Sequence, residues 1–437
     1  MSTSSKDSNE FTIKSHNSNI NIDAISNSLY GLKKSMRIET IKNTPRQSYY
    51  HSLDFDSLRT KIFQERKKTK ANHCMEWLAY ALIGLFVGLT CAIMMYIEEF
   101  LIHEKRLITD LIVQGSSDRL VHGWLFFSGF SVLMAFIASC LTVFYGPGAV
   151  GSGITELIAY LNGVNYPKLL SFATLFTKIF GVLGAVVGNL CVGKEGPMAH
   201  IGANIAIAVA YLPLPNFDFL RNDWTKRELV AAGCSAGVST AFGSPVGGAL
   251  FAYEMSKPNT FWRFGVLWKA FFSCSLAVLV QSVILKLMHD GSANDISAVH
   301  ELKFKATFVE SPTLSTLPAA VILGIICGLL GALFIYVNTN LNKLRKRIIT
   351  RNWQKLLEVV LFSLATSSAF YWVPRFYNQC RSNAEISEEN LDLVVQYNCR
   401  EGEHSPISTM FENEEIGAIR SIMSGFDGPG GIRLPPS

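Results

Sequence analysis

Glu195 is the residue of this chain most able to do chemistry. It lies in the segment GKEGP (193–197), between apolar runs on both sides. An acid at membrane depth is costly and is rarely kept there without a role. Gly193 and Gly196 leave the backbone bare, and Pro197 suits the first turn of a helix. The pattern predicts a helix N-terminus whose amides face a small anion, with the Glu195 carboxylate able to compete for the same position.

Two other Gly-rich elements could contribute to such a site. GPGAVGSGITE (146–156) places the Ser152 hydroxyl, a hydrogen-bond donor, near the expected start of a helix. FGSPVGGALFAYE (242–254) breaks an uncharged run and ends on Glu254. Each element also has a structural interpretation that stays open: Lys194 could pair with Glu195, Ser152 could be a simple N-cap, and the small residues could serve helix packing.

The sequence argues against an enzyme. Residues 188–194 fit the first seven positions of a phosphate-binding P-loop, but Glu195 stands where magnesium binding needs Ser or Thr. His200 has no second histidine at metal-binding spacing, so we interpret it as a satisfied interior histidine. The nine cysteines contain no CxxC pair. We therefore expect no enzymatic activity, no cofactor and no metal site.

Composition predicts the elements that must position these residues. Of 437 residues, 49% are hydrophobic and 17% charged, and the mean hydropathy is +0.25, which is typical of an all-α polytopic membrane protein. Shorter apolar runs between the long ones predict helices that stop midway through the bilayer. The runs long enough to cross it are 77–97, 124–145, 229–253 and 317–342. The shorter runs are 179–193, 198–214, 270–285 and 359–374.

Charge placement predicts the topology. Basic clusters around Lys67 and around Arg345 flank apolar spans and should face the cytoplasm, and no feature favours nucleic-acid binding. The polar loop after the 359–374 run should then be lumenal, so Cys380 and Cys399 are predicted to form a disulfide, with unpaired surface cysteines as the alternative. The predicted divisions are a mostly disordered cytoplasmic tail (1–75), a first membrane repeat (76–288), a polar loop (289–316), a partial second repeat (317–424) with a lumenal loop (375–412), and an irregular tail (425–437).

The three Gly-rich elements, in this order and spacing, resemble the CLC family of chloride channels and chloride/proton exchangers. GSGITE (151–156) is similar to the family's GSGIPE with Thr155 in place of proline, and GKEGP (193–197) matches outright. GSPVGGALFAYE (243–254) is similar to the third motif. The resemblance runs from about residue 50 to about 424. YHSLDFD (50–56) and AYLNGV (159–164) resemble the late-endosomal and lysosomal branch.

The resemblance implies a fold of two inverted repeats, of which the second is incomplete here, and a dimeric assembly. It implies that Glu195 is the gating glutamate and that the Ser152 hydroxyl donates a hydrogen bond to chloride. Serine rather than proline at position 152 implies a preference for chloride over nitrate. The residues placed around the ion are Ser152, Gly153, Ile154, Gly193, Lys194, Gly196 and Pro197.

Two departures from the family pattern shape the predicted function. Nothing after residue 374 matches the family's GxFxP helix start or its late tyrosine, and the paired regulatory domains are missing. Exchangers carry two consecutive acids at the end of the third motif, the second being the inner proton acceptor, whereas this chain has Glu254 followed by Met255.

We therefore predict passive, channel-like chloride transport by a protein that contains the complete second repeat. A chloride/proton antiporter of endosomes or lysosomes is one alternative. A non-conducting chain that assembles with, or inhibits, a full-length relative is another. The expected partners are chloride, the lipid bilayer, and a second copy or a full-length relative in a dimer. The expected location is an endosomal, lysosomal or other intracellular membrane rather than the plasma membrane, with the N-terminus in the cytoplasm.

Overall fold

The computed structural model describes residues 70–412, except 114–118, 167, 215–216, 257–263, 291–316, 378–379, 384–393, 396–398 and 401, together with the backbone of three short strands before residue 70. The polar loop at 289–316, the amphipathic stretch at 415–423, the tail at 425–437 and most of the tail at 1–75 therefore lie largely outside the described residues.

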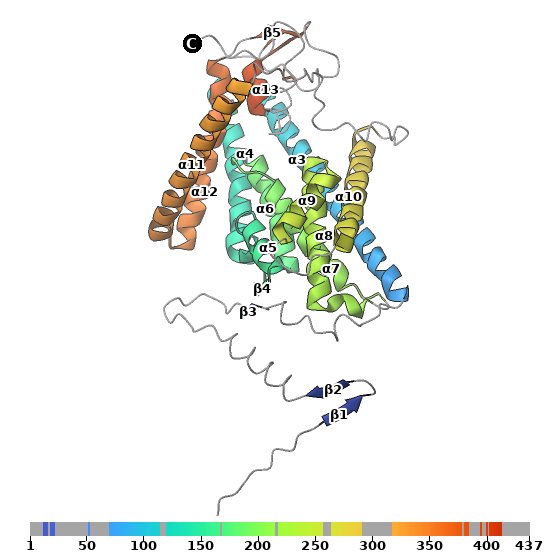
Figure 1. Ribbon diagram of the computed structural model, residues 1–437. Coiled ribbons are helices and arrows are strands. Elements are labelled where there is room, and N and C mark those ends of the chain that lie inside the picture. Colours follow the sequence, from blue (N-terminus) through green and yellow to red (C-terminus); the bar gives the residue numbers. More distant parts are fainter. Residues whose placement is uncertain are drawn as a thin grey trace, which may run out of the picture.

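Helices dominate this part of the chain, which confirms the predicted helical class, and three short antiparallel ladders accompany them (Figure 1). The ladders are β1–β2, β3–β4 and β5–β6; β3 pairs His51 with Asn165 and Ser52 with Val164 of β4. In chain order the elements are β1 (Thr12–Ser15), β2 (Ser18–Asn21), β3 (His51–Ser52), α3 (Lys70–Val113), α4 (Leu120–Cys140), α5 (Ile154–Leu161), β4 (Val164–Asn165), α6 (Phe172–Val187), α7 (Glu195–Ala210), α8 (Asp223–Phe242), α9 (Pro245–Ser256), α10 (Phe264–Asp290), α11 (Leu317–Ile348), α12 (Asn352–Phe376), β5 (Arg381–Ser382), β6 (Glu403–His404) and α13 (Pro406–Glu412).

The core lies where α3, α7, α8 and α10 pack together. Ile83, Val87, Ile201 and Leu229 are fully buried there. The α7–α8 contact is close because both helices present glycines: a Cβ on Gly202 would lie under 3.0 Å from the carbonyl oxygen of Gly233. Small residues let two helix backbones approach in this way, and the close contact fixes α7 against α8.

The predicted single span at 229–253 is wrong. The chain ends α8 at Phe242, turns at Gly243 with a left-handed φ of +65°, and begins α9 at Pro245. Glycine tolerates this backbone conformation, and proline is suited to the first position of a new helix. The Gly/Pro break therefore divides the apolar run into two shorter helices.

Five helices are long and apolar enough to cross a membrane, among the residues described. They include α3, α4 and α11, as predicted, but also the spans Gly265–Met288 in α10 and Asn352–Phe376 in α12. The runs at 270–285 and 359–374 had predicted shorter helices. Helices α10 and α12 continue beyond these apolar runs into flanking polar residues, because backbone hydrogen bonds can extend a helix past its apolar part.

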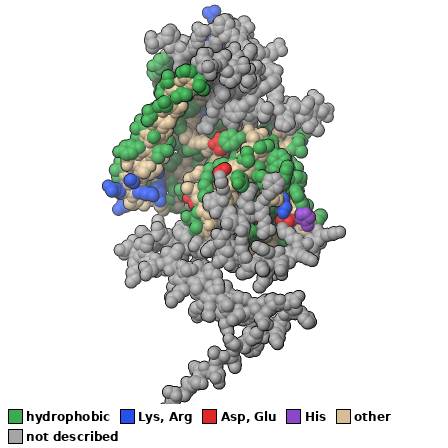
Figure 2. All heavy atoms as spheres, in the orientation of Figure 1, with side chains coloured by type: hydrophobic (Ala, Val, Ile, Leu, Met, Phe, Trp, Pro, Cys, Tyr) green, Lys and Arg blue, Asp and Glu red, His purple; other side chains and the backbone are tan. Residues whose placement is uncertain are grey.

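Helix α11 stands apart from the core. None of its residues is buried, and a Cβ on Gly324, Gly328 or Gly331 would meet no described atom within 4 Å. Figure 2 shows hydrophobic side chains along this helix and a group of basic side chains at its lower end, where Arg345 pairs with Glu358 of α12 at 2.5 Å.

A small polar subdomain closes the opposite end of the molecule from the start of α3 (Figure 1). It contains β5, β6 and α13, and a disulfide joins Cys380 to Cys399 across 19 residues. The start of α3 and the basic end of α11 both lie toward the other end, on opposite sides of the view (Figure 1).

Candidate functional site

Ser152 lies on a turn that only glycines can form easily. Its neighbours Gly151 and Gly153 have φ values of +70° and +84°, and α5 begins directly after them. The Ser152 Oγ accepts a long hydrogen bond of 3.4 Å from the Ile154 amide. Since Ser152 is exposed and no described group accepts its hydroxyl proton, the hydroxyl is available to donate to a ligand.

Glu195 begins α7, two residues before the start that Pro197 alone would predict. Its side chain is half-buried and folds back over Gly193, where a Cβ would lie under 3.0 Å from the Glu195 Oε2. Among the described residues the carboxylate has no ion pair or hydrogen bond. Gly193 therefore provides the space that the carboxylate occupies.

The two predicted anion-binding segments meet. A Cβ on Gly196 would lie 2.8 Å from the Cβ of Ser152, so the turn before α5 touches the first turn of α7. Both helices thus begin at one place, where their unpaired amides and positive dipole ends favour an anion. The arrangement can hold a small anion without a full positive charge from a side chain.

His200 supports this junction from within α7. It is fully buried, its Nε2 lies 3.1 Å from the Leu169 carbonyl oxygen, and its ring occupies the space beside Gly153. The Nδ1 has no hydrogen-bond partner in the described part of the chain. The ring fills the position that a side chain at residue 153 would need, so it acts there by packing.

Lys194 does not pair with Glu195. Its ammonium lies 3.1 Å from the Glu98 Oε1 on α3, and both side chains are at most 10% exposed. The structural interpretation of GKEGP as a Lys194–Glu195 pair is therefore wrong. The backbone of Lys194 precedes α7, but its charge is directed to α3 and away from the carboxylate.

Lys178 anchors the Ser152 turn from α6. It is buried, and its ammonium donates hydrogen bonds to the carbonyl oxygens of Ala149, at 3.0 Å, and Gly151, at 2.5 Å. Those contacts hold the segment that precedes Ser152.

Met255 and Glu254 point to different surroundings. Met255 is 5% exposed and belongs to the apolar cluster with Leu157 and Val230, while Glu254 is exposed. Successive helical residues are rotated by about 100°, which accounts for the difference.

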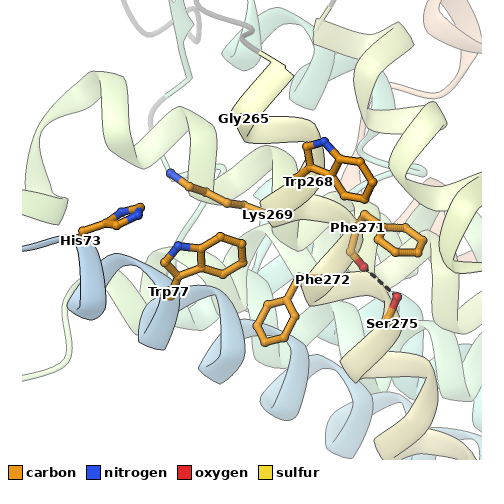
Figure 3. A pocket seen from close by; sticks show the side chains of 8 residues that line it. All are labelled: His73, Trp77, Gly265, Trp268, Lys269, Phe271, Phe272 and Ser275. Carbon is orange, nitrogen blue, oxygen red and sulfur yellow. Dashed lines mark hydrogen bonds between the residues drawn. The ribbon is translucent and has the colours of Figure 1, made fainter.

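A groove that does not belong to this site lies elsewhere on the molecule. It lies between the first turns of α3 and α10, with a volume of about 780 Å³ (Figure 3). Lys269, one of its lining residues, pairs with the buried Glu76 at 2.7 Å. The lining residues are His73, Trp77, Gly265, Trp268, Lys269, Phe271, Phe272 and Ser275.

Three buried charged residues near the site were not predicted from the sequence. Glu98, Lys105 and Lys178 are each no more than 4% exposed, and all three lie within apolar helices. A charge inside an apolar segment indicates a buried partner, and this pattern could have identified them. Their partners could not be predicted, because those partners lie on other elements.

Comparison with known proteins tests the predicted family. The family model for the voltage gated chloride channel matches residues 134–410. The H(+)/Cl(-) exchange transporter 7 of Bos taurus is 31% identical over 409 residues, which cover 88% of this chain and 49% of that protein. The chloride channel protein CLC-a of Arabidopsis thaliana is 30% identical over 419 residues, covering 89% and 53%. The chain thus spans about half the length of these relatives.

Two solved structures share the fold. A slow cyanobacterial Cl-/H+ antiporter aligns with a TM-score of 0.55 at 18% identity, covering 80% of this chain and 74% of its own. A eukaryotic CLC transporter aligns with a TM-score of 0.52 at 24% identity, covering 80% and 58%. These matches support the predicted all-α CLC fold. By its family match and its relatives, this chain belongs to the voltage gated chloride channel family, the CLC family.

Proposed function

We propose that this protein transports chloride across a membrane along a path that passes the Ser152 turn and the first turn of α7. The contact between Ser152 and Gly196 carries the proposal, because it joins a hydroxyl donor to two helix N-termini. Anions bind to such groups, and the absence of a full charge allows them to leave again.

Glu195 is the proposed gate. Its carboxylate lies at the start of α7, where it can occupy the place of an anion when charged and withdraw when protonated. Gly153, Ile154, Gly193, Gly196 and Pro197 contribute backbone around the ion. Lys194 contributes only its backbone, because its side chain is paired with Glu98.

Chloride/proton exchange is the mode that the relatives favour, since several are named H(+)/Cl(-) exchange transporter 7. In this mode Glu195 carries a proton as well as gating the path. Because Met255 cannot titrate, the exposed Glu254 is the proposed inner proton acceptor.

Passive chloride transport is a second candidate, favoured by one observation. Met255 occupies the position at which exchangers carry their inner acid, and it is packed in an apolar cluster. A path without an acid at that position would move chloride without protons.

Vesicles reconstituted with this chain test both modes. An outward chloride gradient is imposed with the potential clamped, and chloride efflux and internal pH are followed together. Glu195→Gln should change chloride flux and abolish proton movement, whereas Glu104→Gln, an acid that is 42% exposed on α3, should change neither. Uphill proton movement in the unchanged chain selects exchange. No chloride flux from a folded chain would exclude transport by this chain itself.

The remaining assignments follow from the family. We propose a dimer, formed with a second copy or a full-length relative, in a lysosomal or endosomal membrane. The start of α3 and the basic end of α11 lie toward the same end of the molecule (Figure 1). Because basic residues favour the cytoplasmic side, this arrangement supports placing both in the cytoplasm. The disulfide subdomain at the other end then faces the lumen.

A further inference from the structure

A short segment connects the end of α6 to the gating residue. It runs from Gly188 to Lys194, contains no helix, and ends at Glu195. A connection of this kind sets the position of the first turn of α7, because α7 begins where the segment ends. Its two ends are held by opposite charges from one helix, α3.

The first end is held by Lys105. Its ammonium donates to the Val187 carbonyl oxygen at 2.9 Å and also to the Asn189 Oδ1. The same ammonium lies 4.6 Å from the centre of the Phe127 ring. Ser363 of α12 adds a hydrogen bond of 2.9 Å to the Gly188 carbonyl oxygen.

The second end is held by Glu98, through its ion pair with Lys194 at 3.1 Å. Glu98 and Lys105 are seven residues apart on α3, which is two helical turns, or about 10 Å of rise. They therefore lie on one face of α3 and contact the segment at two separated points. The exposed fractions of Glu98 and Lys105 are 4% and 3%, so neither contact is weakened by water.

We propose that Glu98 and Lys105 are positioning residues for the Glu195 gate: together they clamp the 188–194 segment to α3. The proposal rests on the role of Glu195 given above. A buried charge whose partner is removed becomes costly, so each of the two residues stabilises one geometry of the segment. The pair with Glu98 also keeps the Lys194 ammonium away from the Glu195 carboxylate.

Cys191 offers a direct measure of the clamp, because it lies between the two anchored ends and is exposed. The full chain in detergent is treated with a soluble maleimide, and labelling is timed at each cysteine by peptide mass mapping. Glu98→Gln and Lys105→Met should each raise the labelling rate of Cys191, by about fivefold or more, because the released segment moves away from α3 and exposes the thiol further. Cys234, buried in the core, should stay unlabelled and so report that the fold is intact.

A second variant covers the case in which a single change unfolds the chain. Glu98→Leu with Lys194→Met replaces the ion pair by apolar side chains, an exchange that buried pairs often tolerate. Faster labelling of Cys191 in this folded variant supports the clamp. A labelling rate equal to that of the unchanged chain, in folded variants at both anchors, would overturn it.

Chloride flux then distinguishes failure of the clamp proposal from failure of the proposed gating role of Glu195. If Glu195→Gln changes the flux, Lys105→Met should reduce the effect of that change when the two are combined, because the gate is already displaced. Purely additive effects would overturn the positioning role. If Glu195→Gln leaves the flux unchanged, the gate assignment fails, and the Cys191 rates still decide whether the segment is clamped.

Discussion

Glu195 folds its carboxylate over Gly193, so that a Cβ at residue 193 would lie under 3.0 Å from the Glu195 Oε2. Gly193 does not have a left-handed φ, so an alanine there would meet no backbone strain. Space for the carboxylate, rather than chain flexibility, is therefore what Gly193 provides.

Gly193→Ala should displace the Glu195 side chain and alter chloride flux while changing the free energy of unfolding by less than about 1 kcal/mol, since the group that must move is the end of a flexible side chain. Flux from vesicles and thermal unfolding measure the two effects. Gly129→Ala, where a Cβ would meet nothing within 4 Å, is the matched control and should alter neither. Unchanged flux in Gly193→Ala would show that the carboxylate position is not important for transport.

In the turn around Ser152, two alanine substitutions can separate the stability cost of backbone strain from the cost of a steric clash. Gly151→Ala and Gly153→Ala both force an alanine into a left-handed conformation, which costs about 1–2 kcal/mol. Only the Cβ at residue 153 would collide with the His200 ring; the one at residue 151 meets nothing within 4 Å. Gly153→Ala should therefore destabilise the chain by at least about 1 kcal/mol more than Gly151→Ala. Equal losses in thermal unfolding would contradict the packing role of His200.

Sequence patterns predicted the local elements of the site well. The glycines around Ser152 and Glu195 predict tight turns and helix starts, because both depend on neighbouring residues. The Gly/Pro break near Gly243 was also visible in the sequence, but the apolar composition of 229–253 still predicted one membrane span instead of two helices. Hydrophobicity alone does not distinguish one long helix from two short ones.

Pairs between residues that are far apart in the chain could not be predicted from the sequence. Lys194 has Glu195 as its neighbour, and proximity in the chain suggests that pair. In the fold, Glu98 lies 3.1 Å from the Lys194 ammonium although 96 residues separate them in the chain. The helix directions of α3 and α7 decide this contact, and no local pattern encodes those directions.

His404 should make the polar subdomain less stable in acid. Burial, and then the nearby Arg381 guanidinium, lowers the pKa of His404, whose Nδ1 lies 2.8 Å from the Asn383 Oδ1. The unfolded subdomain then binds the proton more readily than the folded one, so stability falls as the pH drops below about 6.5 toward the lower folded pKa. Hydrogen exchange at the Asn383 amide, corrected for its intrinsic pH dependence, should speed up over this range. His404→Gln should remove the effect; if the acid response persists in that variant, another group is responsible.

The Cys380–Cys399 disulfide should stabilise the same subdomain independently of pH. A bridge across 19 residues contributes roughly 3 kcal/mol in the chain-entropy treatment. Non-reducing peptide mapping of protein from native membranes should recover the linked peptides, with Cys91 and Cys234 free. Reduction, or Cys380→Ser, should accelerate proteolysis between β5 and β6. Two free thiols in native protein would disprove the bridge.

Met255 allows the proton path to be tested by adding an acid. Met255→Glu and Met255→Gln place side chains of similar size in the same apolar cluster, and both should lower the free energy of unfolding, by about 1–3 kcal/mol for the uncharged forms. Only the glutamate can exchange protons. If residue 255 faces the route toward Glu195, Met255→Glu should move more protons per chloride than Met255→Gln in vesicles under a chloride gradient. Glu254→Gln in the unchanged background completes the comparison. Proton movement that disappears there would identify Glu254 as the inner acceptor, whereas equal proton movement in the two Met255 variants would place residue 255 outside the proton path.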